Sequence, residues 1–175
     1  MSNVKGVVSS WPEKFKNSLT LLGREQVKKA AQKLKTKHID LIFASDLLRT
    51  RQTAEIVGKT LKLAPKFDKR LREVGFGTLN GKTNDLVITT FSDEQLRIDQ
   101  KNQFGSELYK EVLERMTDFL KDVDSQYHGK SILVVSHQCP LWLVEDFVKG
   151  ISLREDIKRN PEEKRINKGE IRELN

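Results

Sequence analysis

Two short apolar runs, at residues 39–44 and 131–136, stand out in the hydrophobic pattern of the chain. Such runs, with almost no polar residue facing either side, are typical of strands buried in a parallel sheet. The stretch at residues 65–68 is a weaker candidate for another strand. We therefore expect a small sheet built from segments far apart in the sequence.

Helices are predicted between these runs, because apolar side chains recur three or four positions apart with charged residues between them. The predicted helices cover residues 19–35, 46–61, 106–127 and 140–150. The first of them is expected to bury Leu19, Leu22, Ala30, Ala31 and Leu34. Ser92 and Gln95 match a capping box, which predicts a further short helix.

Alternation of strands and helices favours an α/β fold of three layers, in which helices flank a mostly parallel sheet. We expect the whole chain, residues 1–175, to form a single domain. Residues 154–172 are highly charged and are expected to form a surface loop, with a possible edge strand at residues 170–174. Ligands of parallel sheets bind at the carboxyl ends of the strands, so the residues that follow the two apolar runs are candidates for a site.

Composition narrows the functional classes. The net charge is +7, but basic and acidic residues interleave along most of the chain, which favours a solvated surface over nucleic-acid binding. No apolar stretch can span a bilayer and no signal peptide is recognisable, so we expect a cytoplasmic protein that does not bind membranes. The one cysteine, Cys139, and the lack of a Cys/His cluster argue against disulfides and structural metal.

The segment from Ser45 to Glu55 has the pattern of a strand that leads into a helix N-terminus. Such a junction offers unpaired backbone N–H groups and the positive end of the helix dipole, and both attract phosphate. Arg49 adds a guanidinium that can hold an anion through two hydrogen bonds. Arg51, in the same segment, is interpreted as a surface residue.

His137 and Glu73 are the other candidates for chemistry. His137 directly follows the second apolar run, where an imidazole can stabilise charge on a phosphoryl group, although a lone histidine is more often a satisfied, partly buried side chain. Glu73 can act as a proton donor beside bound phosphate, or it can be a surface carboxylate paired with Arg72. Cys139 is interpreted as a small apolar residue.

These segments, taken in order, resemble the histidine phosphatase superfamily, which includes phosphoglycerate mutases and many small phosphomonoesterases. Residues 19–26 resemble its Leu-Thr-x-x-Gly-x-x-Gln signature, and residues 45–55 resemble its Ser-x-Leu-x-Arg-x-x-Gln-Thr-Ala-Glu element. Residues 71–77, 104–107 and 134–137 resemble the family's acid segment, its pre-helix turn and its second histidine motif. The resemblance implies a three-layer phosphoglycerate mutase-like fold.

The resemblance also assigns roles. It implies that Arg49 and Asn3 bind the phosphoryl group, that Glu73 protonates the leaving oxygen, and that His137 stabilises the transferring phosphoryl group. The family attacks phosphorus with a histidine from an Arg-His-Gly motif at the end of its first strand, and this motif is missing from the chain. Asn3 aligns with an asparagine that follows this motif in the family, so we expect the first strand to be missing by truncation.

Three interpretations remain open. The intact parent is expected to be a phosphomonoester hydrolase that works through a phosphohistidine, with a small phosphorylated metabolite as substrate, no cofactor, and this chain inactive. The alternatives are a non-catalytic protein that binds phosphometabolites and a cofactor-dependent phosphoglycerate mutase. Mutases carry a longer insertion where this chain has residues 82–103, which favours the hydrolase. Neither the substrate nor the oligomeric state follows from the sequence.

Overall fold

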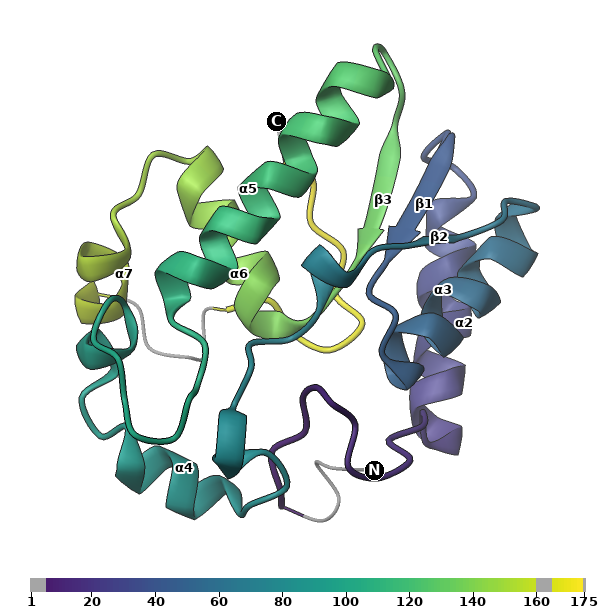
Figure 1. Cartoon of the computed structure of the whole chain (residues 1–175). Coiled ribbons are helices and arrows are strands. Elements are labelled where there is room, and N and C mark those ends of the chain that lie inside the picture. Colours follow the sequence, from purple (N-terminus) through teal and green to yellow (C-terminus); the bar gives the residue numbers. More distant parts are fainter. Residues whose placement is uncertain (1–5, 160–164, 175) are drawn as a thin grey trace.

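A three-stranded parallel sheet lies at the centre of the computed structural model, which describes residues 6–159 and 165–174 (Figure 1). Its order is β2-β1-β3, with β1 at Leu41–Ala44, β2 at Lys66–Phe67 and β3 at Ile132–Val135. Leu41 pairs with Ile132 and Ala44 with Val135, so β1 and β3 end level with each other. The predicted strands and their parallel pairing are therefore confirmed.

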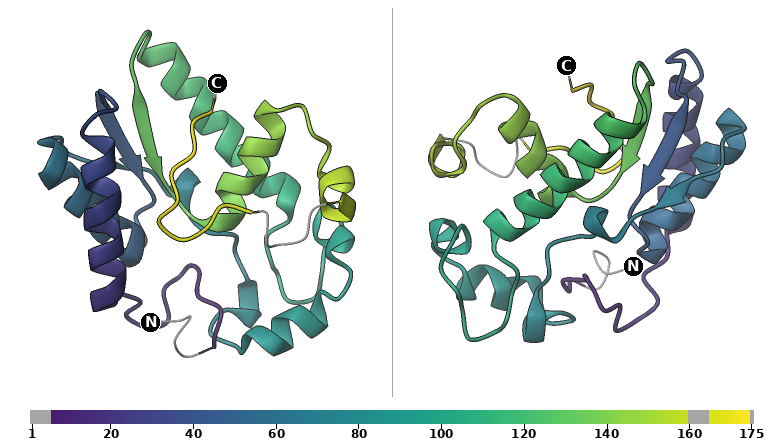
Figure 2. Two further views of the ribbon diagram at one scale, coloured as in Figure 1. Left: turned by 180° about the vertical axis from the view of Figure 1, so that it is seen from behind. Right: turned by 45° about the horizontal axis from the view of Figure 1, so that its top comes forward.

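Helices cover both faces of this sheet, which makes three layers (Figures 1 and 2). One layer contains α2 (Leu21–Leu34) and α3 (Leu48–Leu61), and the other contains α5 (Tyr109–Gln126) and α6 (Gln138–Val148). The sheet residues alternate between two cores. Ile42 and Ala44 pack with α2 and α3, whereas Phe43 packs with α5 and α6. The period of two along β1 thus divides its side chains between the two layers.

Short helices complete the chain. They are the 3₁₀ turns η1 (Lys69–Leu71), η2 (Gly77–Leu79) and η3 (Glu94–Arg97) and the α-helices α4 (Asn84–Thr90) and α7 (Leu153–Arg159). In Figure 1, α4 lies at the lower end of the molecule, away from the sheet. Helix α4 lies beyond the carboxyl ends of the strands, at the same end of the sheet as the N-terminal segment (Figure 1).

Two sequence predictions about these elements are wrong, and one element was not predicted. Leu22 is 70% exposed rather than buried, because α2 turns its Val27 face toward the sheet. The residue that caps η3 is Asp93, whose carboxylate accepts from the Gln95 N–H, and not Ser92. The sequence pattern also missed α4, whose signal was Thr83 at its N-cap.

The charged C-terminal region also differs from the prediction. Part of the expected surface loop is α7, which is held to α6 by a hydrogen bond of 2.7 Å from the Trp142 indole N–H to the buried Asp156 carboxylate. Residues 170–174 form no strand. An edge strand needs a paired neighbour, and among the described residues β3 lies across a groove from this segment and does not pair with it.

The free edge of β3 is the most unusual feature of the sheet. Among the described residues β3 pairs only with β1, and all four of its apolar residues are half-buried, whereas Ile42 to Ala44 of β1 are buried. A groove of about 2230 Å³ runs along this edge between α2, α5 and residues 166–174, and it reaches Arg49 and His137. An apolar strand with one open edge leaves backbone donors and acceptors without partners.

None of the helices that the structure describes is both long and apolar enough to cross a membrane. Asn3, a predicted phosphate ligand, lies outside the described residues.

Candidate active site

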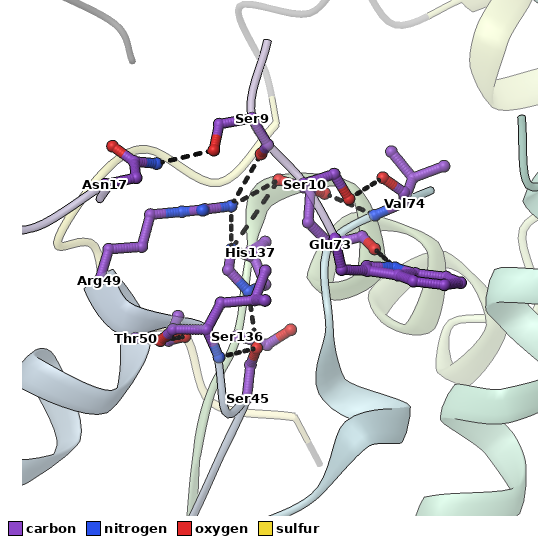
Figure 3. Close-up of polar contacts among 12 residues, drawn as sticks. Ser9, Ser10, Asn17, Ser45, Arg49, Thr50, Glu73, Val74, Ser136 and His137 are labelled. Carbon is purple, nitrogen blue, oxygen red and sulfur yellow. Dashed lines mark hydrogen bonds and ion pairs between the residues drawn. The ribbon is translucent and has the colours of Figure 1, made fainter. Parts of the chain in front are cut away.

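Arg49, Glu73 and His137 lie together at the carboxyl edge of the sheet, although they are far apart in the sequence (Figure 3). Arg49 comes from the first turn of α3, His137 from the residue between β3 and α6, and Glu73 from the segment after η1. Arg49 Nη2 is 2.8 Å from His137 Nδ1, and Glu73 Oε2 is 3.9 Å from both atoms. The structure thus brings the three predicted residues to one place, while their roles stay predictions.

Arg49 is the cation of this group, and it is mostly buried. Its Nη2 donates to the Ser9 carbonyl oxygen at 3.3 Å and to His137, but its Nη1 is shielded from solvent and has no hydrogen-bond partner among the described residues. Burial lowers the pKa of Arg49, and the carboxylates of Glu73 and Glu13 oppose this shift only in part. A buried cation with an unsatisfied donor is costly, and an anion with several acceptor oxygens would satisfy it.

His137 is held between Arg49 and the sheet. A guanidinium can only donate, so Nδ1 of His137 accepts from Arg49 and the ring proton lies on Nε2, which donates to Ser45 Oγ at 2.9 Å. Burial, followed by the charges of Arg49 and Arg115, lowers the pKa of His137 well below its ordinary value. The imidazole is therefore neutral in these surroundings, and a bound phosphate dianion would favour its protonation.

This neutral histidine predicts an acid-labile fold. The folded-state pKa of His137 lies below its unfolded-state value of about 6.5, so the unfolded state binds the proton more tightly and stability falls as the pH drops below that value. The variant His137→Gln keeps an acceptor for Arg49 and a donor for Ser45 but cannot titrate. Urea denaturation between pH 5 and 8 should show a smaller acid loss in this variant than in the parent chain. The exposed His128→Gln variant should leave the profile unchanged, and an equal change in both would contradict the assignment to His137.

The carboxyl group of Glu73 also lies beside the Arg49 guanidinium and the His137 ring. Burial raises its pKa, and this effect outweighs the charges of Arg49, Arg115 and Arg97 and the hydrogen bond from the Val74 N–H. The alternative in which Glu73 pairs with Arg72 is wrong, because Arg72 forms a bidentate ion pair with Asp46 at 2.6 and 2.7 Å. A carboxyl group with a raised pKa is suited to proton transfer.

The segment that carries Glu73 is fixed by Arg115 and Glu107. Glu107 Oε2 accepts from the Gly75 N–H at 2.8 Å, and its Oε1 accepts from Arg115 Nε at 2.7 Å. Arg115 also donates to the backbone oxygens of Arg70 and Glu73. The Trp11 indole N–H donates to the Glu73 carbonyl oxygen at 2.9 Å. The motif at residues 104–107 therefore positions the backbone of the acid segment.

Replacing Glu107 by glutamine should loosen this segment. An amide cannot accept both hydrogen bonds, because its NH₂ group would face either Gly75 or Arg115, and one buried donor would be left without a partner. We expect the free energy of unfolding to fall by about 1–3 kcal/mol, as measured by urea denaturation. Glu114→Gln on the exposed face of α5 makes the same chemical change and should have almost no effect. Equal losses for the two variants would contradict this role.

The backbone at the start of α3 differs from its predicted role. The Leu48 N–H donates to Glu13 Oε2 at 3.1 Å, and the Leu47 N–H lies 3.4 Å from Ser45 Oγ. These donors of the predicted phosphate cradle therefore already have partners within the chain. Among the described residues, the Arg49 side chain keeps an unpartnered donor at this junction, whereas these two backbone N–H groups do not.

Residues 8–17 form part of the site that the sequence pattern did not reveal. Ser9 offers its carbonyl oxygen to Arg49. The buried Ser10 donates twice: its hydroxyl to the Val74 carbonyl oxygen at 2.5 Å and its N–H to the Asn80 side-chain oxygen at 3.0 Å. Figure 3 shows this segment between Arg49 and Glu73. It has no periodic pattern, so only the buried polar contacts identify it.

Gln138 and Cys139 directly follow His137 in the sequence. Burial raises the pKa of the Cys139 thiol, which agrees with its interpretation as an unreactive apolar residue. The Gln138 side chain donates to the Ile166 carbonyl oxygen at 3.1 Å and so turns toward the C-terminal segment.

The model of the histidine phosphatase superfamily (branch 1) matches residues 3–170. Phosphoserine phosphatase 1 of Hydrogenobacter thermophilus is 27% identical over 75% of this chain, which spans 64% of that relative's length. A probable phosphoglycerate mutase of Escherichia coli is 30% identical over 76% of this chain and 64% of its own length.

A solved structure agrees with these relatives at the level of the fold. The YhfR protein of Bacillus stearothermophilus superimposes with a TM-score of 0.77 over 91% of this chain and 79% of its own, at 24% identity. Because the family model covers nearly the whole sequence and the α/β layers agree, the chain belongs to the histidine phosphatase superfamily.

Proposed function

We propose that the intact protein is a phosphomonoester hydrolase that acts through a phosphohistidine intermediate on a small phosphorylated metabolite. Its family and relatives support a phosphatase-type function. The observation that carries the proposal is the unpartnered, buried Nη1 of Arg49 beside His137 and Glu73. These three side chains supply an anion clamp, a stabiliser of phosphoryl charge and a proton donor at one point.

The reaction has two steps. A histidine outside this sequence attacks phosphorus, the bond from phosphorus to the ester oxygen breaks, and Glu73 gives its proton to that oxygen. The Glu73 carboxylate then takes a proton from water, whose oxygen attacks the phosphohistidine and releases inorganic phosphate. Arg49 and His137 hold the phosphoryl oxygens throughout. Arg49 and His137 bring enough positive charge and hydrogen-bond donors for these steps to need no cofactor.

The free edge of β3 provides a place for the missing histidine. A strand that pairs in parallel with β3 would lie in the groove along α2 and α5, and its carboxyl end would reach the Arg49–His137 pair. His38 and His128 cannot take this role, since they precede β1 and β3 and so lie at the opposite end of the sheet. We therefore infer that the nucleophile comes from a strand encoded before Met1, followed by Asn3 as a further phosphate ligand.

The test is to extend the chain. An added strand of about six apolar residues followed by Arg-His-Gly, spaced from Asn3 as in the family motif, should create turnover of phosphate esters. A panel of monoesters should release inorganic phosphate, and acid quench should trap a phosphorylated protein. The matched control carries Arg-Asn-Gly instead, which keeps the strand and removes the nucleophile.

The two extended proteins separate structure from chemistry. Both should melt at a higher temperature than the 175-residue chain, because the strand satisfies the open edge and covers the apolar groove. Only the histidine form should be active. Inactivity of a well-folded histidine form toward every ester would overturn the proposed function, and activity only with a bisphosphorylated primer would favour the mutase.

A non-catalytic phosphometabolite-binding protein is the second candidate. The observation that favours it is the absence of an Arg-His-Gly motif from the sequence. In that case the extended protein would still bind phosphate through Arg49 but would not hydrolyse phosphate esters.

The cytoplasmic location of the protein stays a prediction.

A further inference from the structure

The Ser45 side chain is a buried hydroxyl group on the sheet side of the candidate active site. Ser45 directly follows β1, and its N–H donates to the Val135 carbonyl oxygen at 3.0 Å, which extends the pairing of β1 with β3 by one residue. Ser45 has no exposed surface. His137 is the second residue after β3, so the parallel pairing of the two strands fixes the Ser45 hydroxyl relative to the His137 ring.

The hydroxyl group binds one nitrogen of this ring, and the other nitrogen faces the candidate site. His137 Nε2 lies 2.9 Å from Ser45 Oγ. His137 Nδ1 lies 2.8 Å from Arg49 Nη2 and 3.9 Å from Glu73 Oε2. Figure 3 shows the ring between Ser45 and Arg49. Nδ1 is therefore the ring atom that can reach a phosphoryl oxygen held by Arg49.

A bound phosphate requires Nδ1 to change from a hydrogen-bond acceptor to a donor. Nδ1 accepts from Arg49 and carries no proton, whereas the oxygens of a phosphate dianion only accept hydrogen bonds. Either a second proton is added at Nδ1, or the single proton of the ring moves there from Nε2. The first course gives a cation that donates from both nitrogens, and the second gives a neutral ring that needs a donor at Nε2.

The charged groups around the ring decide how readily it takes a second proton. Burial and the charges of Arg49 and Arg115, from α3 and α5, lower the pKa of His137. The Glu73 carboxyl group, 3.9 Å from Nδ1, favours the charged ring when it is ionised. Phosphate adds negative charge on this side and accepts the hydrogen bonds of Arg49 in place of Nδ1. On the other side, Ser45 is uncharged, and its oxygen accepts from Nε2–H in both protonation states of the ring.

We propose that Ser45 is a positioning residue for His137: it keeps a proton on Nε2, so that the proton taken up with phosphate is added to Nδ1 and faces the phosphoryl oxygens. The added proton comes from water or from the phosphate monoanion, and it uses the Nδ1 lone pair that Arg49 otherwise occupies. Ser45 itself does not touch the phosphate. This inference rests on the proposed function, since it assumes that phosphate binds between Arg49 and His137.

Nitrogen NMR of the 175-residue chain, labelled at histidine, tests this directly with inorganic phosphate as the ligand. The exposed His38 and His128 are internal references, and about pH 6.5 is suitable because exposed histidines are half protonated there. Without phosphate, the His137 ring should carry one proton, on Nε2. At saturating phosphate both nitrogens should be protonated. A proton that moves from Nε2 to Nδ1 would overturn the inference, and so would an unchanged ring or a chain that binds no phosphate.

Ser45→Ala removes the acceptor of Nε2–H and leaves the charged ring with an unsatisfied buried donor. Phosphate binding should weaken about tenfold, and the titration midpoint of His137 with phosphate bound should fall by about one pH unit. The substitution also frees the Leu47 N–H, which lies 3.4 Å from Ser45 Oγ. A free backbone donor at a helix N-terminus attracts anions, so this second effect cannot cause the expected loss.

Ser136→Ala is the matched control. It deletes the hydroxyl group next to His137 in the sequence, which donates to the Leu71 carbonyl oxygen at 2.7 Å rather than to the ring. Phosphate affinity should stay within about twofold of the parent chain, and the His137 midpoint should not move. Equal effects in the two variants, or an unchanged midpoint in Ser45→Ala, would overturn the inference. The NMR of the parent chain decides the question even if Ser45→Ala does not fold, and turnover in the extended protein judges the proposed function separately.

Discussion

Replacing Arg49 by methionine should weaken the binding of inorganic phosphate by about a hundredfold or more without lowering the melting temperature of the chain. Arg49 supplies the unpartnered Nη1 and the nearest positive charge to the space between Glu73 and His137. Its loss removes charge-assisted hydrogen bonds that nothing else at this point can replace. Calorimetric titration with phosphate measures the loss directly.

The same substitution should leave the stability of the folded chain unchanged or raise it. Burial disfavours the charged form of Arg49, and its neighbours compensate only in part. A methionine fills a similar volume and removes the desolvation cost of the cation, and Glu73, whose pKa burial already raises, can become neutral once the charge of Arg49 is gone. Thermal denaturation should therefore give an equal or higher midpoint, and Arg51→Met should change neither phosphate binding nor the midpoint by much. A loss of binding together with a clear fall of the midpoint would indicate that Arg49 is a structural residue instead.

Replacing Gly77 by alanine should cost more than about 4 kcal/mol of stability, or prevent folding. Gly77 has φ of +53°, and an added Cβ atom would meet the backbone oxygen of Phe104 and lie 2.6 Å from that of Gly105. Neither oxygen can move freely, since Phe104 O accepts from the Thr78 N–H at 2.9 Å. The clash lies in the turn that follows Glu73 and should displace this residue. Any folded Gly77→Ala protein should therefore also bind phosphate less tightly.

Gly105→Ala is the control for this prediction. Gly105 has a similar φ of +63°, but an added Cβ atom there meets nothing within 4 Å. This variant should pay only the cost of the left-handed backbone, about 1–2 kcal/mol. Urea denaturation of the two variants separates backbone strain from steric overlap, and equal losses would show that the close approach to Phe104 is unimportant.

Much of the site was predictable because its residues follow strands. Arg49 and His137 come shortly after two apolar runs, and parallel strands place their carboxyl ends at one edge of the sheet, so their proximity follows from the pattern. Glu73 follows no strand, and its place came from the family resemblance. Ser9, Ser10 and Arg97 could not be identified individually, because residues 8–17 and 92–105 lack periodicity and are ordered by hydrogen bonds and ring contacts from distant segments.

Local pattern failed where a neighbour decides the conformation. The backbone donors at the start of α3 were expected to be free, but Glu13 comes from a different segment and accepts one of them. Residues 170–174 were expected to form a strand, but a strand requires a paired edge. Arg72 was considered a partner of Glu73, yet the fold places Asp46 closer. Each outcome depends on contacts between residues that are remote in the sequence.

The sequence by itself determined the order of strands and helices, the parallel sheet, the family and the lack of the attacking histidine, because periodicity and motifs are properties of adjacent residues. Only the tertiary structure decided that His137 is neutral and, within the part of the chain that it describes, that Arg49 and Arg97 have unpaired donors and that β3 has a free edge beside the site. Burial, charge and hydrogen-bond satisfaction depend on which segments meet in space, and this is why they become visible only in the folded chain.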